Sequence, residues 1–146
     1  MAIEEIRAFL RIGDFGTSGM PRPEHFEEIA RAGFKTVINL ALPTSDNAMA
    51  NEGDLVARSG MSYVHIPVLF DAPKRSDYER FKNVLNAVRS EPVFAHCAAN
   101  MRVSAFMFLY RVRSGLAARE HAELDLLKVW TPDPVWRAFI DSVLSE

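Results

Sequence analysis

The sequence predicts an α/β protein with a mainly parallel central sheet of four to five strands flanked by helices. Short β-type runs alternate with helical patterns along the chain, in the order β-α-β-α-β-α-β followed by helices. No repeat, low-complexity tract or linker separates these runs, and 49% of the 146 residues are hydrophobic. Residues 1–146 are therefore expected to form a single domain with one well-buried core.

The first half of the chain supplies two strands and two helices. Phe15–Gly19 fits an edge strand, and Glu24–Ala32 has apolar residues on one helical face with Gly33 as the stop signal. Thr36–Leu40 fits a buried strand. The less periodic segment 41–60 predicts a turn followed by a short helix that ends at Gly60.

The second half supplies two more strands and the remaining helices. Met61–Val68 is rich in β-forming residues, and Ser76–Glu79 has the form of a capping box that opens a helix. Pro92–Ala95 is a short apolar strand that leads directly into His96 and Cys97. Three helices complete the prediction, at about Arg102–Ser114, which is apolar on nearly all sides, Ala117–Val129 and Pro134–Leu144.

Composition excludes several classes of function. The formal net charge is −2, so no global field favours nucleic acid or an anionic membrane. One cysteine allows no intramolecular disulfide, and neither a signal peptide nor a membrane span is recognisable. No cluster has metal-ligand spacing, so neither a metal nor a cofactor is expected. We expect a soluble cytoplasmic protein, and the sequence leaves its oligomeric state open.

The segment from Phe94 to Ser104 holds the residues that suggest chemistry. A strand ends at Cys97, small residues follow, and a buried helix begins near Arg102. Ligands of parallel α/β sheets bind at such strand ends, where the helix N-terminus offers free N–H groups to an anion. That field would stabilise a thiolate, and arginine can hold two oxygens of an oxyanion at once. Asn100 suits a left-handed turn in the loop.

His96-Cys97, Arg102 and Ser104 together resemble the signature loop of protein tyrosine and dual-specificity phosphatases. Three upstream segments resemble the bacterial beta-lactamase-hydrolase-like phosphatase family: Ser18–Pro21, Gly33–Leu40 and Gly60–Val68. The similarity extends from about residue 13 to residue 113. One feature departs from the usual tyrosine phosphatase pattern, because only four residues separate Cys97 from Arg102, one fewer than usual. Either the loop is tighter, or the arginine has moved back one position while the hydroxyl stayed.

The resemblance implies that Cys97 is a nucleophile that forms a phosphocysteine. The loop would bind the phosphate through Ala98, Ala99, Asn100, Met101 and Arg102. Ser104 would donate a hydrogen bond to the cysteine sulfur, and His96 would brace the loop. The substrate would be a phosphorylated small molecule or a phosphoprotein, including phosphotyrosine or another aryl phosphate.

Asp71 is the candidate general acid. Related dual-specificity phosphatases carry an aspartate just after the strand that matches Ile66–Val68, where this chain has Leu69. Asp71 lies two residues further on, which returns to the same face of an extended chain. An ordinary turn residue before Pro73 explains it equally well. Asp133 is better explained as the cap of the last helix.

Two other functions fit the same residues. The short loop resembles that of rhodanese-type sulfurtransferases, which would make Cys97 the carrier of a persulfide. A shortened loop without an acid could also bind phosphate or a phosphoprotein without turnover.

Overall fold

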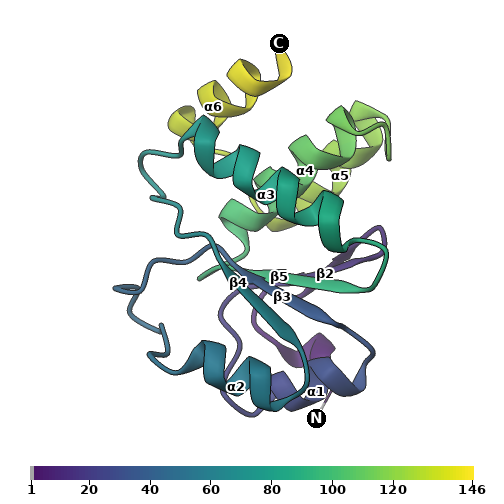
Figure 1. Ribbon diagram of the computed structural model, residues 1–146. Coiled ribbons are helices and arrows are strands. Elements are labelled where there is room, and N and C mark those ends of the chain that lie inside the picture. The colour runs from purple at the N-terminus through teal and green to yellow at the C-terminus, as the bar shows by residue number, and fades with distance from the viewer. Residues whose placement is uncertain (1) are drawn as a thin grey trace.

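The protein has a three-layer α/β fold, described by a computed structural model over residues 2–146 (Figure 1). The strands are β1 (Leu10–Ile12), β2 (Phe15–Ser18), β3 (Thr36–Asn39), β4 (Ser62–His65) and β5 (Val93–His96). The helices are α1 (His25–Arg31), α2 (Glu52–Arg58), α3 (Arg75–Val88), α4 (Met101–Arg113), α5 (Arg119–Val129) and α6 (Pro134–Leu144). A short 3-10 helix, η1 (Ile3–Glu5), precedes them.

The sheet order is β1-β2-β5-β3-β4, and only the β1–β2 pair is antiparallel. The predicted mainly parallel sheet is therefore confirmed, and β1 is the strand that the sequence patterns did not indicate. Strand β5 lies between β2 and β3, and His96 is in register with Ser18 on one side and Asn39 on the other. The loop that follows β5 thus begins at the middle of the sheet's carboxyl edge.

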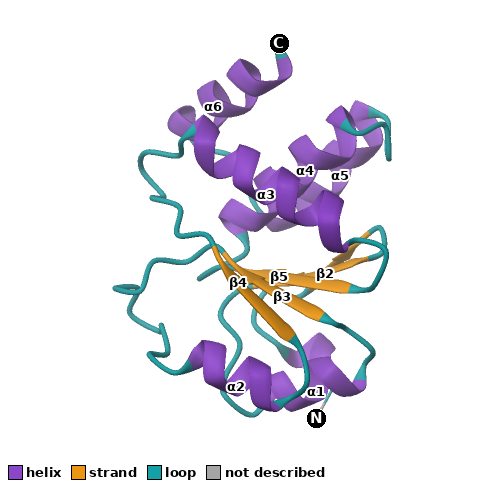
Figure 2. Ribbon diagram, viewed as in Figure 1, coloured by secondary structure: helices purple, strands orange, loops and turns teal. Residues whose placement is uncertain are grey.

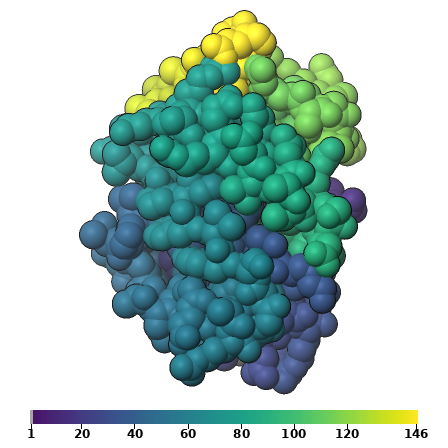
Figure 3. All heavy atoms as spheres, in the orientation of Figure 1, coloured from purple at the N-terminus to yellow at the C-terminus, as the bar shows by residue number. Residues whose placement is uncertain are grey.

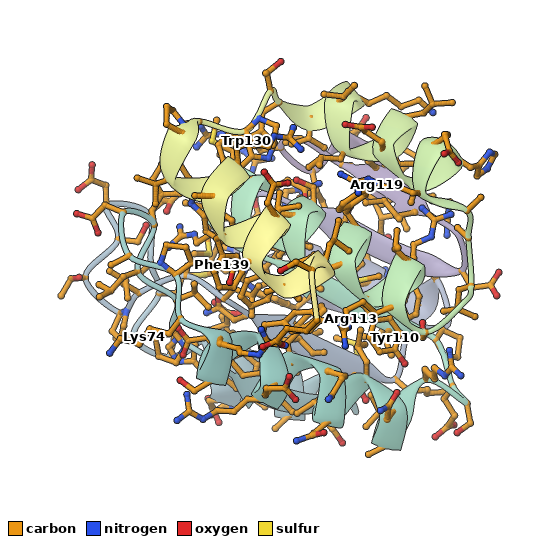
Figure 4. The ribbon with its side chains drawn as sticks, turned by 90° about the horizontal axis from the view of Figure 1, so that it is seen from above. Lys74, Tyr110, Arg113, Arg119, Trp130 and Phe139 are labelled. Atoms are coloured by element: carbon orange, nitrogen blue, oxygen red, sulfur yellow. The ribbon has the colours of Figure 1, made fainter. Side chains whose placement is uncertain are left out.

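The helices cover both faces of the sheet (Figure 2). Helices α3 to α6 lie on one face, and α1 and α2 lie on the other (Figure 1). Central helix α4 is almost wholly buried, because α3, α5 and α6 all pack against it. Figure 4 shows this layer from above, with α6 between α3 and α5. The space-filling view in Figure 3 shows the surface over α3 and β4, with α6 at one end.

Side-chain alternation along β5 sends neighbouring residues to opposite layers. Val93, Ala95 and Cys97 join the large core under α3 to α6, whereas Phe94 joins the smaller core against α1 and α2. His96 points to the second side, where its ring lies 6.3 Å from that of Phe26 on α1. Cys97 and His96 therefore belong to different layers, and α2 is within reach of His96.

Two local predictions are wrong. The strand predicted at Phe15–Gly19 is not an edge strand, because β2 pairs with β1 on one side and with β5 on the other. The capping box predicted at Ser76–Glu79 does not form. Helix α3 begins at Arg75 with Lys74 as its N-cap, and no side chain caps it. Ser76 and Asp77 lie inside the first turn, where Asp77 is buried and accepts a hydrogen bond from Arg80 at 3.1 Å. The capping-box pattern therefore marks the helix start without forming the box.

Candidate active site

The loop of residues 97–100 connects the centre of the sheet to α4. Cys97 is fully buried at its start, and its N–H donates to the Ser18 carbonyl at 3.3 Å. Asn100 ends the loop with φ +66°, the left-handed conformation expected from its residue type. Arg102 is the second residue of α4.

Hydrogen bonds to residues in and next to β2 hold the loop in place. The Met20 N–H donates to the Ala98 carbonyl at 3.1 Å. A Cβ added at Gly19 would lie 2.7 Å from that carbonyl oxygen, so only glycine allows this approach. The Asn100 side-chain amide donates to the Ala8 carbonyl at 2.9 Å and to Thr17 Oγ1 at 3.0 Å. The expected phosphate-binding residue Asn100 therefore anchors the loop with its side chain.

Free amide groups gather at the junction between this loop and α4. Within residues 2–146, the N–H groups of Ala98, Ala99, Met101 and Arg102 donate to no backbone carbonyl. The first N–H groups of a helix lack intrahelical partners, and here they meet the positive end of the α4 dipole. The junction is therefore suited to an anion.

Arg102 is buried beside the loop, and not all of its N–H donors have a hydrogen-bond partner. Its Nη1 donates to the Val68 carbonyl at 2.8 Å, and its guanidinium carbon lies 5.9 Å from the centre of the Phe70 ring. Its Nε is buried and has no partner among the described residues. Because an unpaired buried N–H is unfavourable, an oxyanion beside Arg102 would satisfy a donor that the protein leaves open.

A pocket of about 190 Å³ opens beside these groups. It is lined by Phe70, Cys97, Ala98, Ala99, Met101 and Arg102. The structure thus brings the sequence-predicted cysteine, arginine and most of the loop to one cavity. Larger hollows elsewhere on the surface contain neither Cys97 nor Arg102.

The C-terminal helices hold the wall of the pocket that Phe70 forms. The indole N–H of Trp136 donates to the Phe70 carbonyl at 2.6 Å. The Phe70 ring lies 5.7 Å from that of Trp130 and 6.1 Å from that of Trp136. Figure 4 places Trp130 at the turn between α5 and α6. Sequence reasoning missed Phe70, although its place beside the candidate acid was a usable signal.

Asp71 follows Phe70 in an exposed turn, outside the residues that line the pocket. Its role as an acid remains a prediction. The Ser104 hydroxyl donates to the Met101 carbonyl at 3.1 Å, and among residues 2–146 it makes no hydrogen bond to the Cys97 sulfur. The expected bond from Ser104 to the sulfur remains a prediction as well.

A buried polar network lies behind the loop, on the α1–α2 side. The Glu52 carboxylate accepts a hydrogen bond from His96 Nε2 at 2.5 Å, and both side chains are almost wholly buried. The amide of Asn39 donates to Glu52 at 3.3 Å and to the Tyr63 hydroxyl at 3.0 Å. Burial and the nearby Glu52 raise the pKa of Tyr63 to about 12, so its phenol is neutral.

Glu52 is the site residue that sequence reasoning did not find. It is the first residue of the short helix α2, a position where a carboxylate is ordinary. Its burial and its partner depend on the packing of α2 against the sheet, and no local pattern carries that information.

Neither a metal-binding group of side chains nor a membrane-spanning helix is present among the described residues. Within residues 2–146, no group of His, Cys, Asp or Glu side chains has an arrangement that could hold a metal ion. In the same range, no helix combines the length and apolar character needed to cross a bilayer.

Comparison with known proteins identifies the family. Residues 8–133 match the family described as "DSP-PTPase phosphatase fused to NAD+ Kinase". The chain belongs to this family. It is also similar to the DUF442 protein of Shewanella putrefaciens CN-32, with 32% identity and a TM-score of 0.89 over 98% of this chain and 95% of the other. The chain therefore belongs to a phosphatase family of the dual-specificity and tyrosine-phosphatase type.

More distant matches are found in structure and in sequence. The structure of Tk-PTP matches with a TM-score of 0.80 at 18% identity, covering 95% of this chain and 97% of the other. A Beta-lactamase hydrolase-like protein of Xylella fastidiosa is 28% identical over 109 residues. This match covers 73% of the present chain and 25% of the relative, so the chain spans about a quarter of that protein's length.

Proposed function

We propose that the protein is a cysteine-dependent phosphatase that hydrolyses phosphomonoesters through a phosphocysteine intermediate. The observation that carries the proposal is the convergence of Cys97, the free amides at the start of α4 and the open donors of Arg102 on one small pocket. Family membership supports a phosphatase, and this site supplies a nucleophile and an oxyanion clamp for it.

In the first step the Cys97 thiolate attacks phosphorus. An S–P bond forms while the P–O bond to the leaving group breaks, and Asp71 gives its proton to the departing oxygen. The loop amides and Arg102 stabilise the three equatorial oxygens. In the second step water attacks phosphorus, the S–P bond breaks, and the proton of water passes to Asp71. Inorganic phosphate then leaves, and the Cys97 thiolate and the protonated Asp71 are restored for another cycle.

The walls of the pocket favour a phosphate on an aromatic group. Apart from Arg102 and Cys97, the lining is apolar, and Phe70 offers a ring at the rim. A cysteine-to-serine variant of TpbA from P. aeruginosa is described in complex with pTyr, which is the kind of ligand such a wall suits. Phosphotyrosine or another aryl phosphate is therefore the proposed substrate class.

Hydrolysis of 4-nitrophenyl phosphate tests the proposal. The wild type should turn it over, vanadate should inhibit, and Cys97→Ser should be inactive while folded. Equal, negligible rates for both proteins would contradict the proposal, and tight tungstate binding without turnover would favour a phosphate-binding module. A persulfide on Cys97 after exposure to thiosulfate would favour sulfur transfer.

The role of Asp71 has its own test. Asp71→Asn should lower kcat/KM, which covers only the steps up to formation of the S–P bond, by roughly 10²-fold or more for a substrate with a poor, alkyl leaving group. The loss should be much smaller for 4-nitrophenyl phosphate, whose leaving group needs little protonation. Asp46→Asn, in an exposed turn outside the pocket, is the matched control. Equal losses for both substrates would exclude Asp71 as the acid.

A further inference from the structure

The network behind the loop reaches the anion pocket through one peptide group. His96 Nε2 faces the Glu52 carboxylate, and the other ring nitrogen, Nδ1, faces the Cys97 carbonyl oxygen at 3.4 Å. The C=O and N–H of a trans peptide point in opposite directions, and residues 2–146 contain no cis peptide. Turning the Cys97 carbonyl toward His96 therefore turns the Ala98 N–H away from it.

The next peptide is fixed in the same way. The Ala98 carbonyl is held by the Met20 N–H at 3.1 Å, so the Ala99 N–H points away from Met20. Neither of these two amides has a backbone acceptor among the described residues, and Ala98 and Ala99 both line the pocket beside Cys97. Two outer contacts, one from His96 and one from Met20, thus set the orientation of two amides at the anion site.

We propose that Glu52 is a positioning residue that, through His96, fixes the peptide between Cys97 and Ala98 and so orients an anion-binding N–H. This inference rests on the proposed phosphatase function for its kinetic consequences. Glu52 touches neither the pocket nor Cys97, so its effect passes through the imidazole.

Hydrogen-bond counting shows what each contact of the ring requires. The Nδ1 contact with the Cys97 carbonyl is favourable only when Nδ1 carries a hydrogen, and the Nε2 contact depends on the partner that Glu52 provides. The Cys97–Ala98 peptide is therefore held only while a partner at Nε2 fixes the ring and Nδ1 keeps its hydrogen.

Few other groups face this pair. Asn39 from β3, Phe26 from α1 and Tyr63 from β4 surround it, and Cys97 follows His96 on β5. With a pKa of about 12, Tyr63 stays neutral at the pH of a phosphatase assay.

Two substitutions of Glu52 separate positioning from simple burial. In Glu52→Gln, the amide oxygen can accept from Asn39 and the NH₂ group can donate to Nε2, which leaves the proton of a neutral ring on Nδ1. This variant should keep most of the wild-type kcat/KM. Glu52→Leu provides no partner, and kcat/KM should fall by roughly 10²-fold, as when one oxyanion donor is lost.

A double-mutant cycle shows whether Glu52 acts through His96. His96→Asn places an amide N–H near the position of Nδ1 without needing Glu52. Glu52→Leu should therefore reduce kcat/KM in the wild type and add no further loss in the His96→Asn background. Circular dichroism and the urea midpoint identify which variants are folded. If Glu52→Leu does not fold, Glu52→Gln decides, because most of the wild-type kcat/KM supports the positioning role and a loss of roughly 10²-fold in this folded variant would overturn it.

Binding of tungstate, followed by calorimetry, keeps this inference distinct from the proposed function. Weaker tungstate binding by Glu52→Leu supports the positioning role even if the wild type shows no turnover. A folded Glu52→Leu with the tungstate affinity and kcat/KM of the wild type would overturn it. Equal losses from Glu52→Leu in both backgrounds would do so as well.

Discussion

At the scale of single residues, Arg102 links the pocket to its surroundings. Its guanidinium is restrained by the Val68 carbonyl and by the Phe70 ring, while Nε stays without a partner among the described residues. A planar group held on one side and open on the other can bind two oxygens of a phosphoryl group without reorganising. In the proposed mechanism, the restraint and the unpartnered Nε would both serve to bind phosphate.

Arg102→Lys should therefore separate charge from geometry. Lysine keeps the positive charge but lacks the planar fork, so kcat/KM for 4-nitrophenyl phosphate should fall by about 10²-fold or more. Arg119→Lys, at an exposed position on α5, is the control and should leave the rate unchanged. A conserved rate in Arg102→Lys would show that a point charge is enough.

Sequence reasoning predicted the residues of this site that lie close together in the chain. Cys97, Arg102 and the left-handed Asn100 were evident because one strand, one loop and one helix start contain them. Glu52 was not, because 44 residues separate it from His96 and only tertiary packing brings them together.

At the scale of elements, the last helix supports the rim of the pocket. Asp133 caps α6, accepting a hydrogen bond from the Trp136 N–H at 2.9 Å, as expected from the sequence. Trp136 in turn donates its indole N–H to the Phe70 carbonyl. The start of α6 is therefore connected to the segment that carries Phe70 and Asp71.

Asp133→Ala should lower the free energy of unfolding by about 1 kcal/mol, the usual effect of losing an N-cap. The change should appear as a lower urea midpoint with an unchanged slope. Asp141→Ala, exposed near the other end of α6, is the matched substitution and should have a much smaller effect. Equal midpoints for Asp133→Ala and the wild type would mean that the cap contributes nothing.

The elements themselves were largely predictable. Alternating apolar runs located the parallel strands and the long helices, because periodicity reports burial. β1 was not recognised because it is three residues long and pairs only with β2 at the sheet edge. The capping box failed because the helix starts one residue before Ser76, which leaves the serine within the helix.

At the scale of the whole molecule, the strand order places β5 between its parallel neighbours and brings the loop to the centre of the sheet edge.

The folded protein holds two tyrosines as neutral phenols. Burial raises the pKa of both Tyr63 and Tyr78 to about 12, from an ordinary value of 10.0. The Tyr78 hydroxyl is buried without a partner among the described residues, so the folded state disfavours its phenolate.

This difference predicts alkaline destabilisation. The folded protein holds these protons more tightly than the unfolded chain, so their contribution is complete below pH 10 and is lost as the pH rises toward 12. The urea midpoint should fall over this interval. It should fall less steeply in Tyr78→Phe, which removes one of the two groups. Identical pH profiles for the variant and the wild type would contradict this assignment.

The proposed mechanism depends on a phosphocysteine intermediate on Cys97. Rapid acid quench of the protein during hydrolysis of 4-nitrophenyl phosphate, followed by peptide mass spectrometry, tests it directly. The proposed mechanism predicts one phosphoryl group on the peptide that contains Cys97. It also predicts a larger trapped fraction in Asp71→Asn, because Asp71 takes the proton of the attacking water. Steady turnover with unmodified Cys97, or with the phosphoryl group on another residue, would contradict it.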